Sequence, residues 1–128
     1  MDVRDAVEAD ADRLATLADV PPDVMRNLVH DRTVRVAAAD EEILGFISYD
    51  AREQTVHITQ MQGERQACER LLDEPLGFAD AEDMAVELLI PADEPDVQDA
   101  AVASGFEEVG SGPRFDGVPT TRFRKDAT

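Results

Sequence analysis

The sequence predicts an α/β fold in which a mixed, mostly antiparallel sheet of six to seven strands is flanked by about four helices. Short runs rich in β-forming residues alternate with longer segments whose apolar residues recur at helical spacing. The chain has 128 residues, of which 43% are hydrophobic, so it is long enough to bury one core and too short for two. We therefore expect a single domain over residues 1–128.

The first part of the chain is predicted to hold a strand, two helices and a hairpin. Residues 3–7 have the composition of a short strand, and an amphipathic helix is expected from about residue 9. Two consecutive prolines then separate this helix from a second helix over residues 23–30. Residues 33–39 and 43–49 are rich in β-formers and are joined by three acidic residues, so they predict a β-hairpin.

The middle of the chain is predicted to form a strand, a long helix and a buried strand. Residues 55–61 alternate as a third sheet strand of this group would, and Gly63 marks the turn into a helix with an apolar stripe. Pro75 lies within that helix, where it removes a backbone donor, so we expect a kink or a restart there. Residues 84–90 are a nearly continuous apolar run, which predicts a buried strand.

The last part of the chain is predicted to hold one helix and two closing strands. The helix opens near Pro95 and closes at Gly105, the residue type favoured just past a helix end. Residues 106–109 and 118–123 follow as strands. Asp116 and Gly117 between them have the chemistry of a hairpin turn.

The charge of the chain excludes several classes of partner. Twelve basic residues stand against 29 acidic ones, which gives a formal net charge of −17, and Lys125 is the only lysine. Such a surface repels polyanions, so nucleic acid and anionic membranes are not expected as partners. The composition fits either an acidic, partly disordered protein or a folded protein adapted to molar salt. The apolar content is too high and too regular for the first, and the composition resembles that of halophilic, haloarchaeal proteins.

The N-terminal residues and the few cysteines and histidines predict the localisation and exclude disulfide and zinc chemistry. No apolar run approaches the roughly 20 residues that span a bilayer, and residues 1–7 lack the pattern of a signal peptide, so a cytoplasmic protein is expected. The single cysteine, Cys68, excludes an internal disulfide, and its place on an apolar stripe favours a small core residue over a nucleophile. With only His30 and His57, no spacing resembles a zinc site, and no metal is expected.

The predicted order of elements resembles the GNAT N-acetyltransferase fold over nearly the whole chain. The residues that match the family's opening strand and first helix are Val3, Arg4, Ala6, Asp10, Leu14 and Leu17. Those that match its third strand are Ile43, Leu44, Gly45, Phe46 and Ile47. Those that match its closing helix end and final hairpin are Gly105, Phe106, Phe115, Asp116 and Gly117.

The resemblance implies acetyl-CoA as co-substrate and a loop that binds its pyrophosphate. The family uses a Q/R-x-x-G-x-G/A loop between its fourth strand and the next helix, where backbone N–H groups and the helix dipole favour negative charge. Here Gly63 falls at the Gln or Arg position, Gln66 at the first glycine and Cys68 at the last small residue, so the loop is degenerate. Arg65 either contacts phosphate or is a solvated residue of a first helical turn. The implied cofactor-binding residues are Ile58, Thr59, Gln60, Gly63, Glu64, Arg65, Gln66, Ala67 and Cys68.

Two residues are candidates for catalysis under this resemblance. Amine acetylation needs a base for the ammonium and an acid for the leaving thiolate. His57 lies in mid-strand near the expected thioester, and Glu53 lies where many family members have a carboxylate at the start of the fourth strand. The favoured interpretation of His57 is nevertheless an inert residue of the packed sheet, and that of Glu53 an ordinary turn residue. The family's common tyrosine acid, four residues before Gly105, is replaced by Ala101, whereas Glu87 is a candidate for recognition of the substrate amine or a residue of an open sheet edge.

Three functional hypotheses follow from the sequence. The first is an acetyl-CoA-dependent N-acetyltransferase that acts on a small-molecule or peptide amine. The second is a catalytically silent GNAT-like domain that binds acyl-CoA or a protein partner, and the third is an unrelated small-molecule-binding α/β domain. A homodimer is compatible with each of them. If acetyl-CoA binds, strands four and five should splay apart beside residues 63–68.

Overall fold

A computed structural model describes residues 1–127 and has the α/β architecture that the sequence predicts. The strands are β1 (Asp2–Asp5), β2 (Thr33–Ala39), β3 (Glu42–Arg52), β4 (Thr55–Gly63), β5 (Ala85–Pro91), β6 (Glu107–Ser111) and β7 (Thr120–Lys125). The helices are the 3₁₀ helix η1 (Glu8–Asp10) and the α-helices α1 (Ala11–Ala18), α2 (Pro22–Asp31), α3 (Arg65–Glu82) and α4 (Pro95–Ala103). No helix within residues 1–127 is long and apolar enough to cross a membrane.

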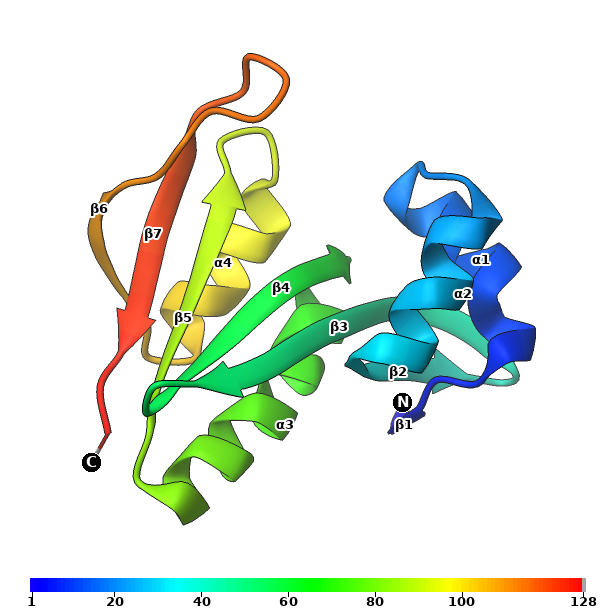
Figure 1. The fold of residues 1–128 in the computed structure, drawn as a ribbon, viewed down its shortest axis with the longest axis horizontal. Coiled ribbons are helices and arrows are strands. Elements are labelled where there is room, and N and C mark those ends of the chain that lie inside the picture. Colours follow the sequence, from blue (N-terminus) through cyan, green and yellow to red (C-terminus); the bar gives the residue numbers. More distant parts are fainter. Residues whose placement is uncertain (128) are drawn as a thin grey trace.

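The seven strands form one sheet in the order β1-β2-β3-β4-β5-β7-β6. All neighbours are antiparallel except β4 and β5, which run parallel and are connected by α3. Figure 1 shows these two central strands starting side by side and diverging along their length. This mixed, mostly antiparallel sheet confirms the predicted fold class.

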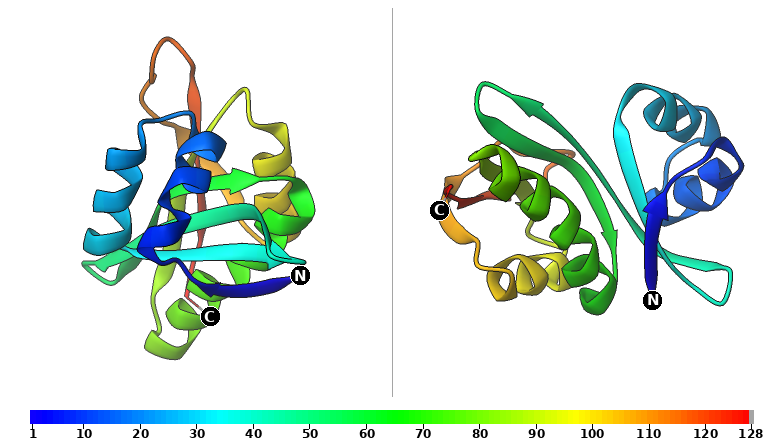
Figure 2. Two further views of the ribbon diagram at one scale, coloured as in Figure 1. Left: turned by 90° about the vertical axis from the view of Figure 1, so that its right-hand side faces the viewer. Right: turned by 90° about the horizontal axis from the view of Figure 1, so that it is seen from below.

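The helices cover opposite faces of the sheet and enclose two hydrophobic clusters. The helices α3 and α4 lie on one face, whereas α1 and α2 lie on the other, over the β2–β3 part of the sheet (Figures 1 and 2). Leu71 and Leu72 of α3 are fully buried in the first cluster. Phe46 of β3 is fully buried in the second, beneath Leu14 and Met25. Because strand side chains alternate between the two faces, each strand residue can be assigned to one side.

The helix does not restart at Pro75, which was one of the two outcomes expected there. The helix α3 runs without interruption from Arg65 to Glu82 with Pro75 inside it. The missing N–H and the steric clash of a helical proline cost about 3 kcal/mol. Leu71 and Leu72 before Pro75 and Ala79 after it are all buried, and each leucine contributes about 1.5–3 kcal/mol on burial. Packing on both sides of the proline therefore keeps the two halves in one helix.

Tight turns form where the sequence predicts hairpins, and one more forms at residues that do not usually favour a turn. Asp116 and Gly117 both have positive φ, as a type I′ turn requires. Glu53 and Gln54 do so as well, with φ of 52° and 66°, although neither residue favours this region. This turn lets β3 and β4 pair further than predicted, from Arg52 and Thr55 onward.

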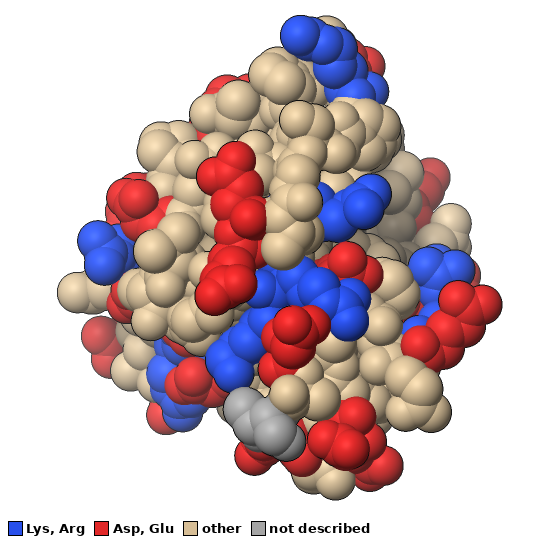
Figure 3. Space-filling model, turned by 90° about the vertical axis from the view of Figure 1, so that its left-hand side faces the viewer, with Lys and Arg blue, Asp and Glu red and all other residues tan. Residues whose placement is uncertain are grey.

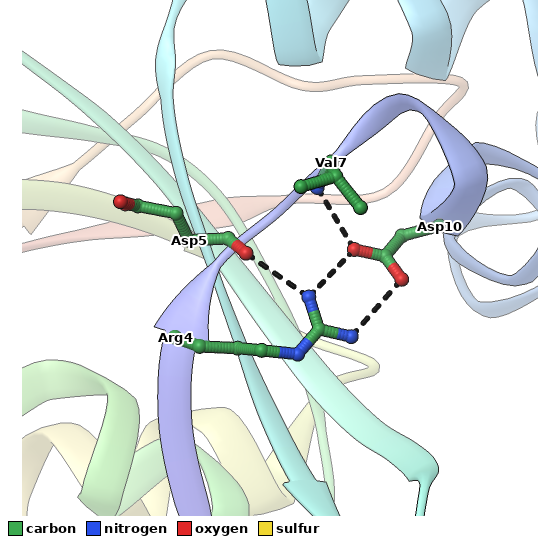
Figure 4. A network of polar contacts seen from close by, with 4 residues as sticks. All are labelled: Arg4, Asp5, Val7 and Asp10. Carbon is green, nitrogen blue, oxygen red and sulfur yellow. Dashed lines mark hydrogen bonds and ion pairs between the residues drawn. The ribbon is translucent and has the colours of Figure 1, made fainter.

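A polar network at the N-terminus ends β1 earlier than predicted (Figure 4). The Asp10 carboxylate accepts two hydrogen bonds from Arg4, at 2.8 and 3.1 Å, and a third from the backbone N–H of Val7 at 2.9 Å. Because Val7 donates to this carboxylate and not to a neighbouring strand, the chain leaves the sheet after Asp5 and turns into η1. The Arg4 guanidinium also lowers the pKa of Asp10, which is buried.

We expect Asp10→Asn to lower the free energy of unfolding at pH 7 by about 1–2 kcal/mol, the lower range for hydrogen bonds to a charged group, because Arg4 is half exposed. The folded-state pKa of Asp10 is lowered, so its ionised form adds stability above the unfolded-state pKa, and this stability is lost as the pH falls through the folded-state value. The difference between wild type and variant should thus shrink below about pH 4. Urea unfolding from pH 7 to pH 3 measures it, with exposed Asp2→Asn as control. A difference that stays constant with pH would contradict this assignment.

Candidate functional site

The central feature of the sheet is the separation of β4 from β5. The two strands pair only from Thr55 to Ile58 on one side and from Ala85 to Leu88 on the other. Beyond Ile58, β4 stays paired with β3 as far as Gly63, whereas β5 stays paired with β7 as far as Pro91. The sheet therefore opens into a V at its centre, as Figure 1 shows.

A β-bulge lies at the point where β4 leaves β5. In the β3–β4 ladder Ser48 pairs with Gln60 and Tyr49 with Ile58, which leaves Thr59 as the extra residue. Its hydroxyl lies 2.8 Å from the Ser48 hydroxyl and donates to the Ser48 carbonyl at 3.1 Å. Because a bulge bends its strand and increases the local twist, this one helps to direct β4 away from β5.

A cavity of about 770 Å³ lies in the V. Alternation along the strands places its walls on both faces of the sheet. On the side of α3 and α4 the walls include the apolar residues Ile58, Met61, Leu88 and Val97, together with Glu94 at the start of α4. On the opposite side the walls include His57, Gln60, Glu87, Leu89, Phe115 and Arg122. The cavity thus passes through the sheet, with a mainly apolar end and a polar end.

The N-terminus of α3 lies at the end of β4 and offers backbone donors. The first backbone N–H that bonds within the helix is that of Cys68, which donates to the Glu64 carbonyl at 3.0 Å. The Glu64 side chain makes no capping hydrogen bond. The N–H groups of the first turn, residues 65–67, therefore remain available, and the helix dipole favours an anion there. Gln66, at the position of the family's first glycine, is exposed and has a negative φ, so its side chain leaves these donors accessible.

Small residues bring the end of β4 close to β3 and α3. A Cβ on Gly45 would lie 2.6 Å from the Gln62 carbonyl oxygen and 3.3 Å from the Ala67 Cβ. Gly63 has φ of +141°, and a Cβ there would lie 3.0 Å from the Leu44 carbonyl oxygen. Glycine is needed at both positions, and their close packing sets the angle at which α3 leaves the sheet. The donor set and its packing fit a pyrophosphate held by backbone N–H groups.

The charged side chains near this loop do not supply a free positive charge for an anionic ligand. Arg65 is bound to Glu69 one helical turn later, with Nε 3.1 Å from the carboxylate. Burial raises the pKa of Glu94, at the start of α4, and the negative charge of Asp93 adds to that effect. Gln62 opposes the shift through a hydrogen bond to Glu94. An anion at α3 would thus be held mainly by backbone donors.

The structure brings most of the predicted site residues together. His57, Ile58, Thr59 and Gln60 line the cavity. The segment from Gly63 to Cys68 forms the junction at the start of α3, although Ala67 and Cys68 point into the core. Glu53 lies in the exposed turn at the other end of β4 and is not one of the residues that line the cavity.

Several cavity residues were not predicted as part of the site. Gln62, Glu94 and Phe115 lie on three separate segments, and Phe115 was matched only to the family's final hairpin, not to a site. Arg122 was not predicted as a site residue either. The sequence distance between these residues is large, and only the divergence of β4 and β5 brings them to one cavity. A long-range pattern of this kind has no local sequence signal.

Comparisons with known proteins identify the fold. No protein-family model and no curated protein match the chain. The wild-type protein TTHA1254 of Thermus thermophilus is 28% identical, over 91% of this chain and 98% of its own, with a TM-score of 0.75. A GNAT-family acetyltransferase from Bacillus cereus ATCC 10987 has a TM-score of 0.79 at 18% identity, over 99% of this chain and 97% of its own. Ribosomal-protein-alanine N-acetyltransferase from Brucella melitensis has a TM-score of 0.79 at 17% identity, over 98% and 99%.

These structures superpose on this chain over nearly all residues of both, so they share its arrangement of helices and strands. The chain therefore has the GNAT fold, as its sequence predicted. The V between β4 and β5 and the helix that starts beside it are the parts of that fold that form the site described above.

Proposed function

We propose that this protein is an N-acetyltransferase that transfers an acetyl group from acetyl-CoA to an amine. The observation that carries the proposal is the V between β4 and β5, which opens beside the unused backbone donors at the start of α3. Both features would suit one elongated ligand, which has an anionic pyrophosphate and a narrow arm. The fold shared with acetyltransferases supports the same conclusion.

Each part of the site has a separate role in this proposal. The backbone N–H groups of residues 65–67 would hold the pyrophosphate. Ile58, Met61, Leu88 and Val97 would line the path of the arm and exclude water from it. When bound, acetyl-CoA supplies a thioester whose acetyl carbon forms a bond to the amine nitrogen while the carbon–sulfur bond breaks. The amine loses a proton, and the sulfur leaves as the thiol of CoA.

His57 is the proposed acceptor of the amine proton. It is half buried, lines the cavity, and lies on the polar side of the V, from which an amine would enter. A base placed at the reacting nitrogen contributes about 10²–10⁴-fold to the rate. Glu53 is remote from the cavity lining and has no role in this proposal.

The surroundings of Cys68 favour direct transfer of the acetyl group to the amine over an intermediate in which this cysteine is acetylated. Burial raises the pKa of its thiol to about 12, with Asp96, Glu94 and Glu69 adding to the shift. The Sγ atom lies 3.4 Å from the Gly63 carbonyl oxygen, in contact distance for a thiol donor. A neutral, fully buried thiol is a poor nucleophile, so the amine and acetyl-CoA would react in one ternary complex.

Titration calorimetry with acetyl-CoA in molar KCl tests the first step. We expect saturable binding and a rise in the thermal midpoint. A coupled thiol-release assay over a panel of amines then tests transfer. No heat and no thermal shift at millimolar acetyl-CoA would overturn the proposal. Binding without thiol release for any amine would instead identify a silent domain.

We expect His57→Gln to lower kcat/KM by about 10²-fold or more, with acetyl-CoA binding unchanged, because glutamine cannot accept the proton. The matched control is His30→Gln, which removes the other histidine of the chain. His30 is exposed on α2, away from the cavity, and lies 3.4 Å from Glu8. Equal rates for the two variants would assign His57 to the packing of the sheet.

A further inference from the structure

The polar end of the cavity is an open part of the sheet. Strand alternation places Glu87 and Leu89 of β5 on this face, and the register places Arg124 and Arg122 of β7 directly opposite them. The helices α1 and α2 lie away from this part of the sheet (Figure 1). Ala18 and Val20, at the turn between those helices, contribute the far wall of the cavity.

Two arginines on this face differ in their surroundings. Arg124 lies between Glu87 and Glu107 in the register and forms ion pairs with Glu87 at 3.5 Å and Asp126 at 2.6 Å. Arg122 lies between Leu89 and Gly110, so neither neighbouring strand places a carboxylate directly opposite it. Of these two arginines, the one that lines the cavity is thus the one with no carboxylate directly opposite it in the sheet.

Arg122 is exposed, and it belongs to the minority of arginines for which no ion pair forms among the described residues. Within residues 1–127, ion pairs are formed by eight of the eleven arginines, which are Arg4, Arg13, Arg26, Arg32, Arg35, Arg65, Arg70 and Arg124. Arg122 forms none among the described residues and lines the cavity. Basic side chains gather over β6 and β7 and are bordered by acidic ones (Figure 3). A carboxylate of a ligand would give Arg122 the partner that the chain does not.

The same face also carries a carboxylate, which is paired with Arg124. Glu87 lines the cavity two residues before Leu89, and residues two apart on a strand are separated by about 6.5 Å. An acidic group and a basic group therefore follow one another along the face. Leu89 and Phe115 form an apolar wall beside them, and both are exposed to solvent in this structure.

From this arrangement we infer that the acceptor is an α-amino acid with an apolar side chain, whose carboxylate binds Arg122. The inference rests on the proposed acetyl transfer, because it takes the amine at the V as the reacting group. Arg122 pairs with Leu89, the first residue of β5 beyond its last pair with β4, so a carboxylate there places the neighbouring amine at the opening of the V. A guanidinium binds a carboxylate with two parallel hydrogen bonds, which also fixes the orientation of the ligand. The net charge of −17 alone would suggest a purely cationic substrate, and the local geometry favours a zwitterion.

Three ligands with one carbon skeleton test the inference on the full-length protein in molar KCl. They are L-leucine, 3-methylbutylamine, which lacks the carboxylate, and 4-methylpentanoate, which lacks the amine. Ligand-observed NMR titration gives the dissociation constants without requiring turnover. We expect L-leucine to bind about 10- to 100-fold more tightly than 3-methylbutylamine, and at least several-fold more tightly than 4-methylpentanoate. Equal affinities for L-leucine and 3-methylbutylamine would overturn the inference.

The variant Arg122→Gln should bring the affinity for L-leucine close to that for 3-methylbutylamine and leave 3-methylbutylamine unchanged. Arg52→Gln is the charge-matched control, since Arg52 is exposed and lies outside the cavity lining, and it should leave both affinities unchanged. Thiol release from acetyl-CoA separates the two proposals. Turnover of L-leucine and 3-methylbutylamine with equal kcat/KM would retain the acetyltransferase and remove this acceptor class. The predicted pattern of affinities without thiol release for either amine would retain the amino-acid site and remove the transfer.

Discussion

Dialysis from molar KCl to about 10 mM salt is expected to lower the thermal midpoint of this protein by more than about 10 °C, which corresponds to roughly 2–4 kcal/mol for a domain of this size. The Debye length grows from about 3 Å to about 30 Å over this range, so surface carboxylates begin to repel one another across the whole molecule. The net charge of −17 leaves most of the 29 acidic residues without a basic partner. Unfolding relieves this repulsion, and low salt therefore favours the unfolded chain.

Differential scanning calorimetry at several KCl concentrations measures this effect. Sucrose at matched osmolarity is the control, because it favours the compact state without screening charge. The midpoint should respond to KCl far more than to sucrose. An unchanged midpoint between molar and millimolar salt would remove the proposed adaptation to high salt.

The variant Phe46→Ala should lower the free energy of unfolding by about 3–5 kcal/mol. Phe46 is fully buried on β3, in the cluster that α1 and α2 form with the sheet, and its removal leaves a cavity that the rigid strands on either side cannot close. The matched control is Phe78→Ala on α3, where 44% of the side chain is already exposed. Urea unfolding in molar KCl compares the two variants. Equal losses would mean that the α1–α2 layer contributes little to the stability of the sheet.

The elements of this fold were largely predictable because each depends on local pattern. The run of β-formers at residues 33–39 coincides with β2. The helix α4 begins at Pro95 and ends before Gly105, as predicted. The errors arose where tertiary contacts outweigh local preference. Burial on both sides of Pro75 keeps α3 whole, and the Asp10 carboxylate takes the N–H of Val7 out of the sheet.

The candidate site was predictable only in the part that lies close together in the sequence. The strand and helix start at residues 57–68 are one continuous segment, and the resemblance to a known loop identified them. Arg122 and Glu94 belong to the same cavity, although 28 residues separate them in the chain.

The sequence by itself determined the fold class, the order of the elements and the acidic surface, because periodicity, turn chemistry and charge are properties of neighbouring residues. Only the tertiary structure decided that β4 and β5 part after Ile58 and Leu88, and that the gap passes through the sheet. It also decided which charges face that gap. The register of β7 against β5 sets Arg124 beside Glu87 and Arg122 beside Leu89, and a different register would place other residues beside Arg122.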